Sequence, residues 1–257
     1  MYIDKERNLL IIEKEKDTPP LRLNKKITGH PFVDILGFNP YKLSGDALLS
    51  LHGLVTEAVD EKWLRRGNKA EEIVRLVYER DGHKCTVYDD DYKKANYYTC
   101  FPQLRSWGGL IDIELIEEQT LIEVKSKSLD KFPEIAIQGK IPEDEFMQGM
   151  FYAFLRGYKK FTMEYIFFDK DTEEEIFQGK KPTTLKNISR FSIESPVDEE
   201  KIKECMKKCS QIVNEFRQNL TLPLDTISPK YIQMLKDNGM LPKDDNTNNT
   251  NIVELPF

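Results

Sequence analysis

The segment that most constrains the fold is residues 110–127, which reads LIDIELIEEQTLIEVKSK. Two runs of alternating apolar and polar residues lie on either side of a short polar stretch, a pattern typical of a β-hairpin. A tight turn between the two strands predicts that Asp112 lies opposite Lys125 and that Glu114 lies opposite Glu123. The segment therefore predicts two antiparallel strands that carry charged side chains on one face.

Glu123 and Lys125 are separated by one residue, so their side chains point to the same face of the second strand. A pair of this kind is most often part of a solvated sheet surface, and this alternative stays open for the motif taken by itself. Asp112 and Glu123 could instead share one hard cation such as Mg²⁺ across the hairpin. Lys125 would then orient or deprotonate a water molecule, or stabilise charge on a phosphoryl oxygen. The polar face is therefore a candidate site for phosphodiester cleavage.

The rest of the chain predicts one α/β domain in which helices flank a small mixed sheet. Helical periodicity and chain breakers predict helices at 31–37, from Ser44 onward, at 71–82, at 143–156 and at 198–219. Alternating patterns predict strands within 85–101, within 110–127 and at 161–169.

Three parts of the chain differ in composition. Residues 1–26 are expected to form an N-terminal hairpin or arm, because an apolar run is interrupted by a Pro-Pro pair and then resumes. Residues 27–235 are expected to form the α/β domain. Residues 236–257 become polar and include the Asn-rich stretch 243–251. We expect this tail to be a frayed terminus or to dock on a partner through its Pro-Phe end.

The net charge of −6 argues against a protein that holds nucleic acid by bulk positive charge. Local basic pairs such as Lys25-Lys26 still allow a basic patch, because binding responds to the distribution of charge. No apolar run is long enough to span a membrane, and the N-terminus is too charged for a signal peptide. We therefore expect a cytoplasmic protein.

The cysteines and histidines do not suggest a metal site. There is no C-x-x-C motif, and the three histidines are scattered along the chain. Cys205 and Cys209 share a helical stripe with apolar residues, which predicts that they pack in the core.

The charged face resembles the core of the PD-(D/E)xK nuclease superfamily. The matching residues are Asp112 in GGLIDIEL and Glu123-x-Lys125 in LIEVKSKS. The stretch RRGNKAEEIV resembles the G-x-x-x-E helix that precedes this core in exonuclease members, and it supplies Glu71 as a third acid. By chemistry alone, Glu72 is equally suitable.

Two further stretches narrow the resemblance. QGMFY is similar to the Q-x-x-x-Y helix that follows the core in RecB-like and phage-exonuclease branches, and it places Gln148 and Tyr152 on one helix face. Residues 27–55 are similar to the N-terminal block of YqaJ-type viral recombinases, the phage lambda exonuclease group. In that block a serine is usual where this chain has His30. The resemblance covers about residues 27–168 and implies a restriction-endonuclease-like fold.

This resemblance implies a metal-dependent DNA exonuclease that degrades one strand of linear duplex DNA in the 5′ to 3′ direction for phage-type recombination. It implies that Asp112, Glu123, the Val124 carbonyl and Glu71 bind Mg²⁺ or Mn²⁺. Lys125 would act on the attacking water. An endonuclease of restriction or repair type on the same core, and a nuclease-fold protein that binds DNA or a partner without cutting, remain alternatives.

The resemblance also implies supporting residues and partners. Gln148 and Tyr152 would support the site or the DNA, and Arg22, Lys25 or Lys26 would hold a 5′ phosphate. The implied partners are duplex ends, a single-strand annealing or single-strand-binding protein, and further copies of the chain in a trimer. Related CRISPR-adaptation nucleases bind an iron–sulfur cluster through four cysteines, but the cysteine spacing here predicts no such cluster.

Overall fold

The computed structural model describes residues 1–13, 21–22, 24–58, 60–88, 100–180 and 188–242. The tail stretch that was expected to fray or to dock on a partner, residues 243–257, lies outside the described residues. No helix in the described ranges is long and apolar enough to cross a lipid bilayer.

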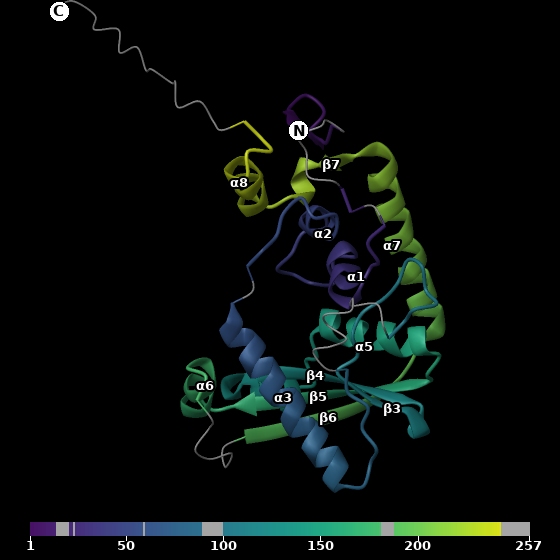
Figure 1. Ribbon diagram of the computed structural model, residues 1–257, viewed down its shortest axis with the longest axis vertical. Coiled ribbons are helices and arrows are strands. Elements are labelled where there is room, and N and C mark those ends of the chain that lie inside the picture. The colour runs from purple at the N-terminus through teal and green to yellow at the C-terminus, as the bar shows by residue number, and fades with distance from the viewer. Residues whose placement is uncertain (14–20, 23, 59, 89–99, 181–187, 243–257) are drawn as a thin grey trace, which may run out of the picture.

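A four-stranded sheet organises the lower part of the molecule in Figure 1. Its strands, in spatial order, are β3 (Ile113–Leu115), β4 (Thr120–Ser128), β5 (Lys160–Phe168) and β6 (Ile188–Pro196). β4 and β5 are parallel and the other two pairs are antiparallel, so the sheet is mixed. The connection from β4 to β5 contains helix α5 (Glu143–Arg156), as a parallel crossover requires. The predicted α/β class with a small mixed sheet is confirmed.

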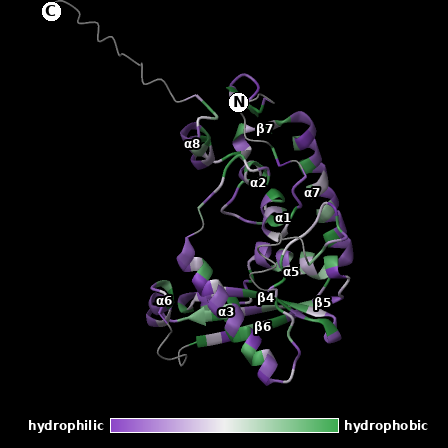
Figure 2. Ribbon diagram, in the orientation of Figure 1, coloured by the Kyte–Doolittle hydropathy of each residue, from purple (hydrophilic) through white to green (hydrophobic). Residues whose placement is uncertain are grey.

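Helices cover both faces of this sheet (Figures 1 and 2), and the sheet separates two apolar layers. On one face lie α3 (Glu61–Arg80) and α6 (Lys170–Phe177). On the other face lies α5, and beyond it are α1 (Gly29–Ile35), α2 (Ser44–Leu51) and α7 (Glu199–Asn219). Helix α7 buries most of the predicted apolar stripe: Ile202, Cys209, Val213 and Phe216.

The strand β4 has two different faces because successive side chains alternate. Ile122 and Val124 belong to the layer under α3, whereas Leu121 belongs to the layer under α5. Glu123 and Lys125 therefore share one face of the strand, as the sequence predicted, and this is the face that α5 covers. The neighbouring β5 was expected to alternate in burial, but every residue after the first is buried, since this strand is covered on both faces.

A second, three-stranded antiparallel sheet lies at the other end of the molecule. Its strands are β1 (Tyr2–Asp4), β2 (Leu9–Ile11) and β7 (Thr221–Pro223), so the N-terminal hairpin pairs with the segment that follows α7. The helix α8 (Pro229–Asp237) follows β7 and packs beside α2 through Tyr231. The division of the chain into arm, domain and tail stays a prediction.

The predicted register of the hairpin was wrong by two residues. Ile113 pairs with Ile122, and the ladder of β3 ends at Leu115. The tight turn was expected at 117–120, after a first strand that ended at Ile116. Ile116 instead begins a 3₁₀ turn at Ile116–Glu118, which closes through Gln119 in the left-handed conformation. Turn geometry therefore overrode the apolar pattern in setting the register.

Two other local predictions do not match the described residues. In the described part of 85–101 there is only an isolated bridge between Thr86 and Glu114, and residues 89–99 lie outside the described residues. The helix expected at 71–82 begins ten residues earlier, at Glu61. It buries Ala70 and Val74 and leaves Leu76 about half exposed, because the side of the helix that carries Ala70 and Val74 contacts the sheet.

Candidate active site

Asp112 lies immediately before β3 and is held by the sheet itself. Its Oδ2 accepts a hydrogen bond of 2.8 Å from the backbone N–H of Val124. Since β3 begins only at Ile113, the carboxylate takes the place that a strand carbonyl would otherwise fill at the next step of the ladder. This contact brings Asp112 to the same part of β4 as Glu123.

Glu123 is almost completely buried, with 1% of its surface exposed. Its Oε1 accepts a hydrogen bond of 2.8 Å from Lys125 Nζ, whereas its Oε2 has no hydrogen-bond partner in the described part of the chain. Burial, followed by the negative charge of Asp112, raises the pKa of Glu123 to about 8. Among the described residues, the buried carboxylate of Glu123 therefore has a hydrogen-bond partner for only one of its two oxygens.

Lys125 lies beside this carboxylate and is fixed from two sides. Its Nζ donates to Glu123 Oε1 and, at 3.1 Å, to Gln148 Oε1 on α5. Burial lowers the pKa of Lys125, but the charges of Glu123, Asp112 and Glu145 outweigh it and raise the pKa overall. The structure thus brings together Asp112, Glu123, Lys125 and Gln148, as the motifs predicted.

Tyr152, one helical turn after Gln148, contacts main chain rather than the charged cluster. Its hydroxyl accepts a hydrogen bond of 3.0 Å from the N–H of Gly29, at the start of α1. Its ring lies so close to Gly109 that a Cβ there would be 2.4 Å from Tyr152 Cε1. Tyr152 therefore joins α5 to α1 and to the segment that leads into Asp112.

Replacing Gly109 by alanine should destabilise the protein by about 3 kcal/mol or more, because the new methyl group overlaps a buried ring and the backbone has φ +146. Gly37→Ala is the matched control, since φ is also positive at +76 but nothing lies within 4 Å of the added Cβ. Its cost should be about 1 kcal/mol, from the backbone alone. Urea denaturation of both variants tests this prediction, and equal losses would contradict it.

Helix α3 contributes Glu71 rather than Glu72. Glu71 is partly buried, and its negative charge makes a smaller contribution to the raised pKa of Glu123, after burial and Asp112. Glu72 is exposed and pairs with Lys69 at 2.9 Å. The sequence left open whether Glu71 or Glu72 is the third acid. The structure favours Glu71, because it lies on the side of α3 that is closer to Glu123.

Arg66, which the sequence analysis did not single out, fastens α3 to β4. Its Nε donates to Ser126 Oγ at 3.2 Å, its Nη2 donates to the Ser126 carbonyl at 3.1 Å, and Nη1 contacts Glu173. These contacts hold the helix one turn before Glu71. The signal in the sequence was weak, because Arg-Arg pairs are common on solvated helix surfaces.

His30 lies on the same side of the sheet as Lys125. The pKa of His30 is lowered to about 4, first by the protein atoms that surround the ring and then by the positive charges of Lys125 and Lys42. Solvent nevertheless reaches the side chain. Because the positive charge of Lys125 acts on the ring, the residue that departs from the family pattern lies near the charged cluster.

The three basic residues proposed as phosphate contacts do not gather as one group. Lys26 Nζ donates to the Phe101 carbonyl at 3.0 Å, which directs it toward the protein interior. Arg22 and Lys25 lie close together. Burial lowers the pKa of Lys25, and the nearby positive charge of Arg22 lowers it further. Arg22 and Lys25 therefore remain candidates for an anion contact, and Lys26 is a poorer one.

The residues present fit a hard divalent cation, although the acids are not arranged as a complete site. Among the described residues, no three His, Cys, Asp or Glu side chains are grouped closely enough to hold a metal ion. Asp112 and Glu123 nevertheless provide carboxylate oxygens, the ligands that Mg²⁺ prefers. Glu123 Oε2 is a buried acceptor for which the described residues offer no hydrogen-bond donor. Main-chain oxygen and water would complete the coordination.

Comparison with known proteins agrees with this arrangement. The family model of the YqaJ-like viral recombinase domain matches residues 21–159, which is more than half of the chain. The chain belongs to the YqaJ-like viral recombinase family. The matched residues of this YqaJ-like domain contain the proposed site residues Glu71, Asp112, Glu123 and Lys125, together with the Q-x-x-x-Y pair. The chain has no significant match among curated protein sequences.

Solved structures give the same fold. The alkaline exonuclease LHK-Exo from Laribacter hongkongensis is 16% identical with a TM-score of 0.51, over 84% of this chain and 94% of that one. Its complex with dAMP gives 15% identity and a TM-score of 0.52, over 85% and 95%. A phage-related exonuclease from Haemophilus somnus 129PT is 16% identical with a TM-score of 0.51, over 76% and 96%. The YqaJ-like chain therefore has the fold of PD-(D/E)xK-type exonucleases.

Proposed function

We propose that this chain is a metal-dependent DNA exonuclease that degrades one strand of linear duplex DNA, from the 5′ end, for phage-type homologous recombination. The observation that carries the proposal is the cluster of Asp112, Glu123 and Lys125 on one face of β4. Membership of the YqaJ-like family and the fold shared with solved exonucleases support it.

The proposed metal ligands are Asp112, Glu123 and the Val124 carbonyl, with Glu71 nearby on α3. A bound Mg²⁺ or Mn²⁺ would lower the pKa of a coordinated water and polarise the phosphoryl oxygen. Without the cation, Glu123 keeps a buried oxygen that has no hydrogen-bond partner in the described chain, and the charge of Asp112 acts against it. A positive charge between these two carboxylates would relieve both costs.

Lys125 is proposed to act on the substrate through the one N–H donor of its ammonium group that neither Glu123 nor Gln148 accepts from. The ammonium group has three donors, and two of them are directed to Glu123 Oε1 and Gln148 Oε1. The third can reach a water molecule or a non-bridging phosphoryl oxygen on which negative charge develops. Gln148 would hold Lys125 in place, and Tyr152 would fix the helix that carries Gln148.

The remaining parts of the proposal concern the DNA and the setting. Arg22 or Lys25 would hold the 5′ phosphate, with Lys26 the weaker candidate because it is engaged with Phe101. The proposed partners are a single-strand annealing or single-strand-binding protein and two further copies of the chain in a ring around the duplex. The protein would work in the cytoplasm of a bacterial or phage-infected cell.

The test compares linear duplex with closed circular DNA of the same sequence, each incubated with Mg²⁺, with Mn²⁺ and with EDTA. We expect release of nucleotides from the linear form only, from labelled 5′ ends before labelled 3′ ends, and none in EDTA. Cutting of closed circles would favour the endonuclease alternative. Binding without cutting under every metal condition would favour a non-cleaving DNA-binding protein.

A further inference from the structure

A cavity of about 620 Å³ opens next to the charged cluster. Its walls are the turn at 38–41 between α1 and α2, the π-helical turn η3 (Pro133–Ile137), the start of α5 and Lys127 of β4. Lys127 is two residues after Lys125 on the same face of the strand. The two Cα atoms are therefore roughly 7 Å apart, a distance that one nucleotide of an extended single strand can cover.

The cavity also shares a carboxylate with the cluster. Glu145, at the start of α5, pairs with Lys127, and its negative charge contributes to the raised pKa of Lys125. Its other oxygen accepts a hydrogen bond of 3.0 Å from Tyr165 of β5. The cavity is therefore a direct extension of the candidate active site along β4.

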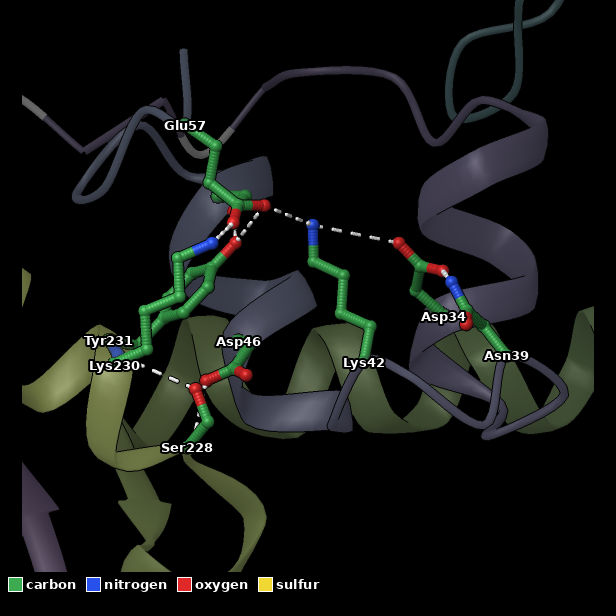
Figure 3. A network of polar contacts seen from close by, with 9 residues as sticks. Asp34, Asn39, Lys42, Asp46, Glu57, Ser228, Lys230 and Tyr231 are labelled. Carbon is green, nitrogen blue, oxygen red and sulfur yellow. Dashed lines mark hydrogen bonds and ion pairs between the residues drawn. The ribbon is translucent and has the colours of Figure 1, made fainter. Parts of the chain in front are cut away.

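The turn that forms one wall of the cavity is held rigidly. Asn39 accepts a hydrogen bond of 2.9 Å from the N–H of Tyr41. It also donates one of 2.8 Å to Asp34 (Figure 3). Lys42 Nζ lies 3.7 Å from Asp34 Oδ2 and 3.3 Å from Glu57 Oε2. The backbone on both sides of Tyr41 is therefore tied to α1 and to the segment that follows α2.

This network continues into the C-terminal helix. Glu57 also accepts a hydrogen bond of 2.7 Å from the Tyr231 hydroxyl and pairs with Lys230, both on α8 (Figure 3). Ser228, which caps α8, donates its N–H to Asp46 of α2 at 2.9 Å. The turn is thus ordered before any ligand arrives, and binding would require little loss of conformational entropy there.

Tyr41 is directed away from this rigid support into solvent, with 95% of its surface exposed. No aromatic ring or cation in the described part of the chain contacts it. An aromatic ring presented on a preorganised turn is the usual form of an anchor for a flat or apolar ligand.

The charges around the cavity indicate which property of the ligand is recognised. Lysines and carboxylates line it in nearly equal number, and Lys127 pairs with Glu145 while Lys131 lies 3.6 Å from Glu134. Three lysines and four carboxylates line the cavity, so there is no excess positive charge to attract phosphate groups. Recognition by the face of the Tyr41 ring is favoured instead, and a nucleobase offers the matching flat surface.

We propose that Tyr41 is a stacking platform for an unpaired nucleobase next to the DNA end that is bound at the charged face. This inference rests on the proposed nuclease function and adds a base contact to it. Stacking of one base on an aromatic side chain stabilises the complex without regard to sequence. The contact would hold the strand about one nucleotide away from Lys125.

The test measures binding in EDTA, so that it does not depend on cleavage. The probe is a duplex with a short single-stranded end that carries 2-aminopurine, whose fluorescence falls when the base stacks. Tyr41→Ala should raise Kd about tenfold and restore the fluorescence, whereas Tyr41→Phe should keep both within twofold of the starting protein. The control is Tyr2→Ala, because Tyr2 is a half-exposed aromatic residue on β1 at the other end of the molecule (Figure 1).

Salt provides a second criterion. Tyr41→Ala should raise the Kd for the DNA probe by the same factor at low and at high salt, since the substitution removes no charge. Unchanged Kd and fluorescence in Tyr41→Ala would overturn the inference while leaving the proposed function intact. Unchanged DNA binding together with loss of self-association would show that the ring contacts protein, and would also overturn it. Failure of the unaltered protein to bind any DNA end would overturn the proposed function as well.

Discussion

Lys125→Met should lower the rate of nucleotide release by about a thousandfold, the usual scale for loss of a group that transfers protons or stabilises charge in a transition state. Methionine keeps most of the length of the lysine side chain but removes the ammonium group that Glu123 and Gln148 hold in place. The measurement is the rate of release from linear duplex at saturating Mg²⁺. Lys160→Met is the control, because Lys160 lies on the same sheet but is exposed and pairs with Glu194.

The same substitution should also cost stability, which must be separated from the loss of activity. At pH 9, where Glu123 with its pKa of about 8 is ionised, removing Lys125 leaves a buried charge without its ion-pair partner, and breaking a buried pair in this way costs about 3 kcal/mol. The double variant Lys125→Met/Glu123→Gln should regain most of this stability in urea denaturation at the same pH, since no unpaired buried charge remains. It should regain no activity. Release within tenfold of the starting rate by the folded Lys125→Met protein would contradict the assigned role.

The free energy of unfolding should fall by about 3 kcal/mol between pH 6.5 and pH 4 through His52 alone. His52 is completely buried; its Nδ1 bonds the Leu48 carbonyl at 2.8 Å, and its Nε2 accepts from Arg217 Nε at 3.1 Å. Burial, followed by the charges of Arg217 and Lys25 and opposed by the Leu48 carbonyl, lowers the pKa of His52 to about 4. In this window the unfolded chain binds a proton that the folded chain does not, so stability is lost as pH falls.

His52→Gln should flatten this part of the pH profile. Glutamine does not titrate, so urea denaturation across pH 4 to 6.5 should show a slope smaller by up to one proton. The variant should be less stable at every pH, because the imidazole also packs against Phe216 with ring centroids 4.7 Å apart. Only the slope is therefore compared. An NMR titration that gives His52 a pKa near 6.5 in the folded protein would contradict the prediction.

The acids and the lysine of the site could be predicted because each lies in a short motif on an element with a strong pattern. Glu123 and Lys125 share a face of β4 for the simple reason that strand side chains alternate. The helix at 143–156 was predicted with its correct bounds, so Gln148 was placed on the right element to reach Lys125. The exact partner of Asp112 could not be predicted, since it depends on where a turn ends the first strand.

Residues that act through distant contacts were missed. Arg66 fastens α3 to Ser126, sixty residues away in the sequence, and no local pattern marks such a pair. His30 was noted only as a departure from a family pattern, and its place beside Lys125 follows from the packing of α1 against α5. The strand β6 was not predicted either, because its alternation of partly buried and exposed residues resembles that of a polar surface segment.

The hydrogen bond from Val124 to Asp112 makes correct folding of this hairpin measurable. A hairpin whose strands were offset by two residues would keep each side chain on its proper face and bury the same apolar groups. Compactness and helix content would hardly change, but the carboxylate of Asp112 would be displaced along β4 by roughly 7 Å. Molecules trapped in that pairing would have nearly native compactness and helix content, but Asp112 would not lie beside Glu123. The specific activity of a preparation would then measure the fraction of chains whose hairpin folded in the correct register.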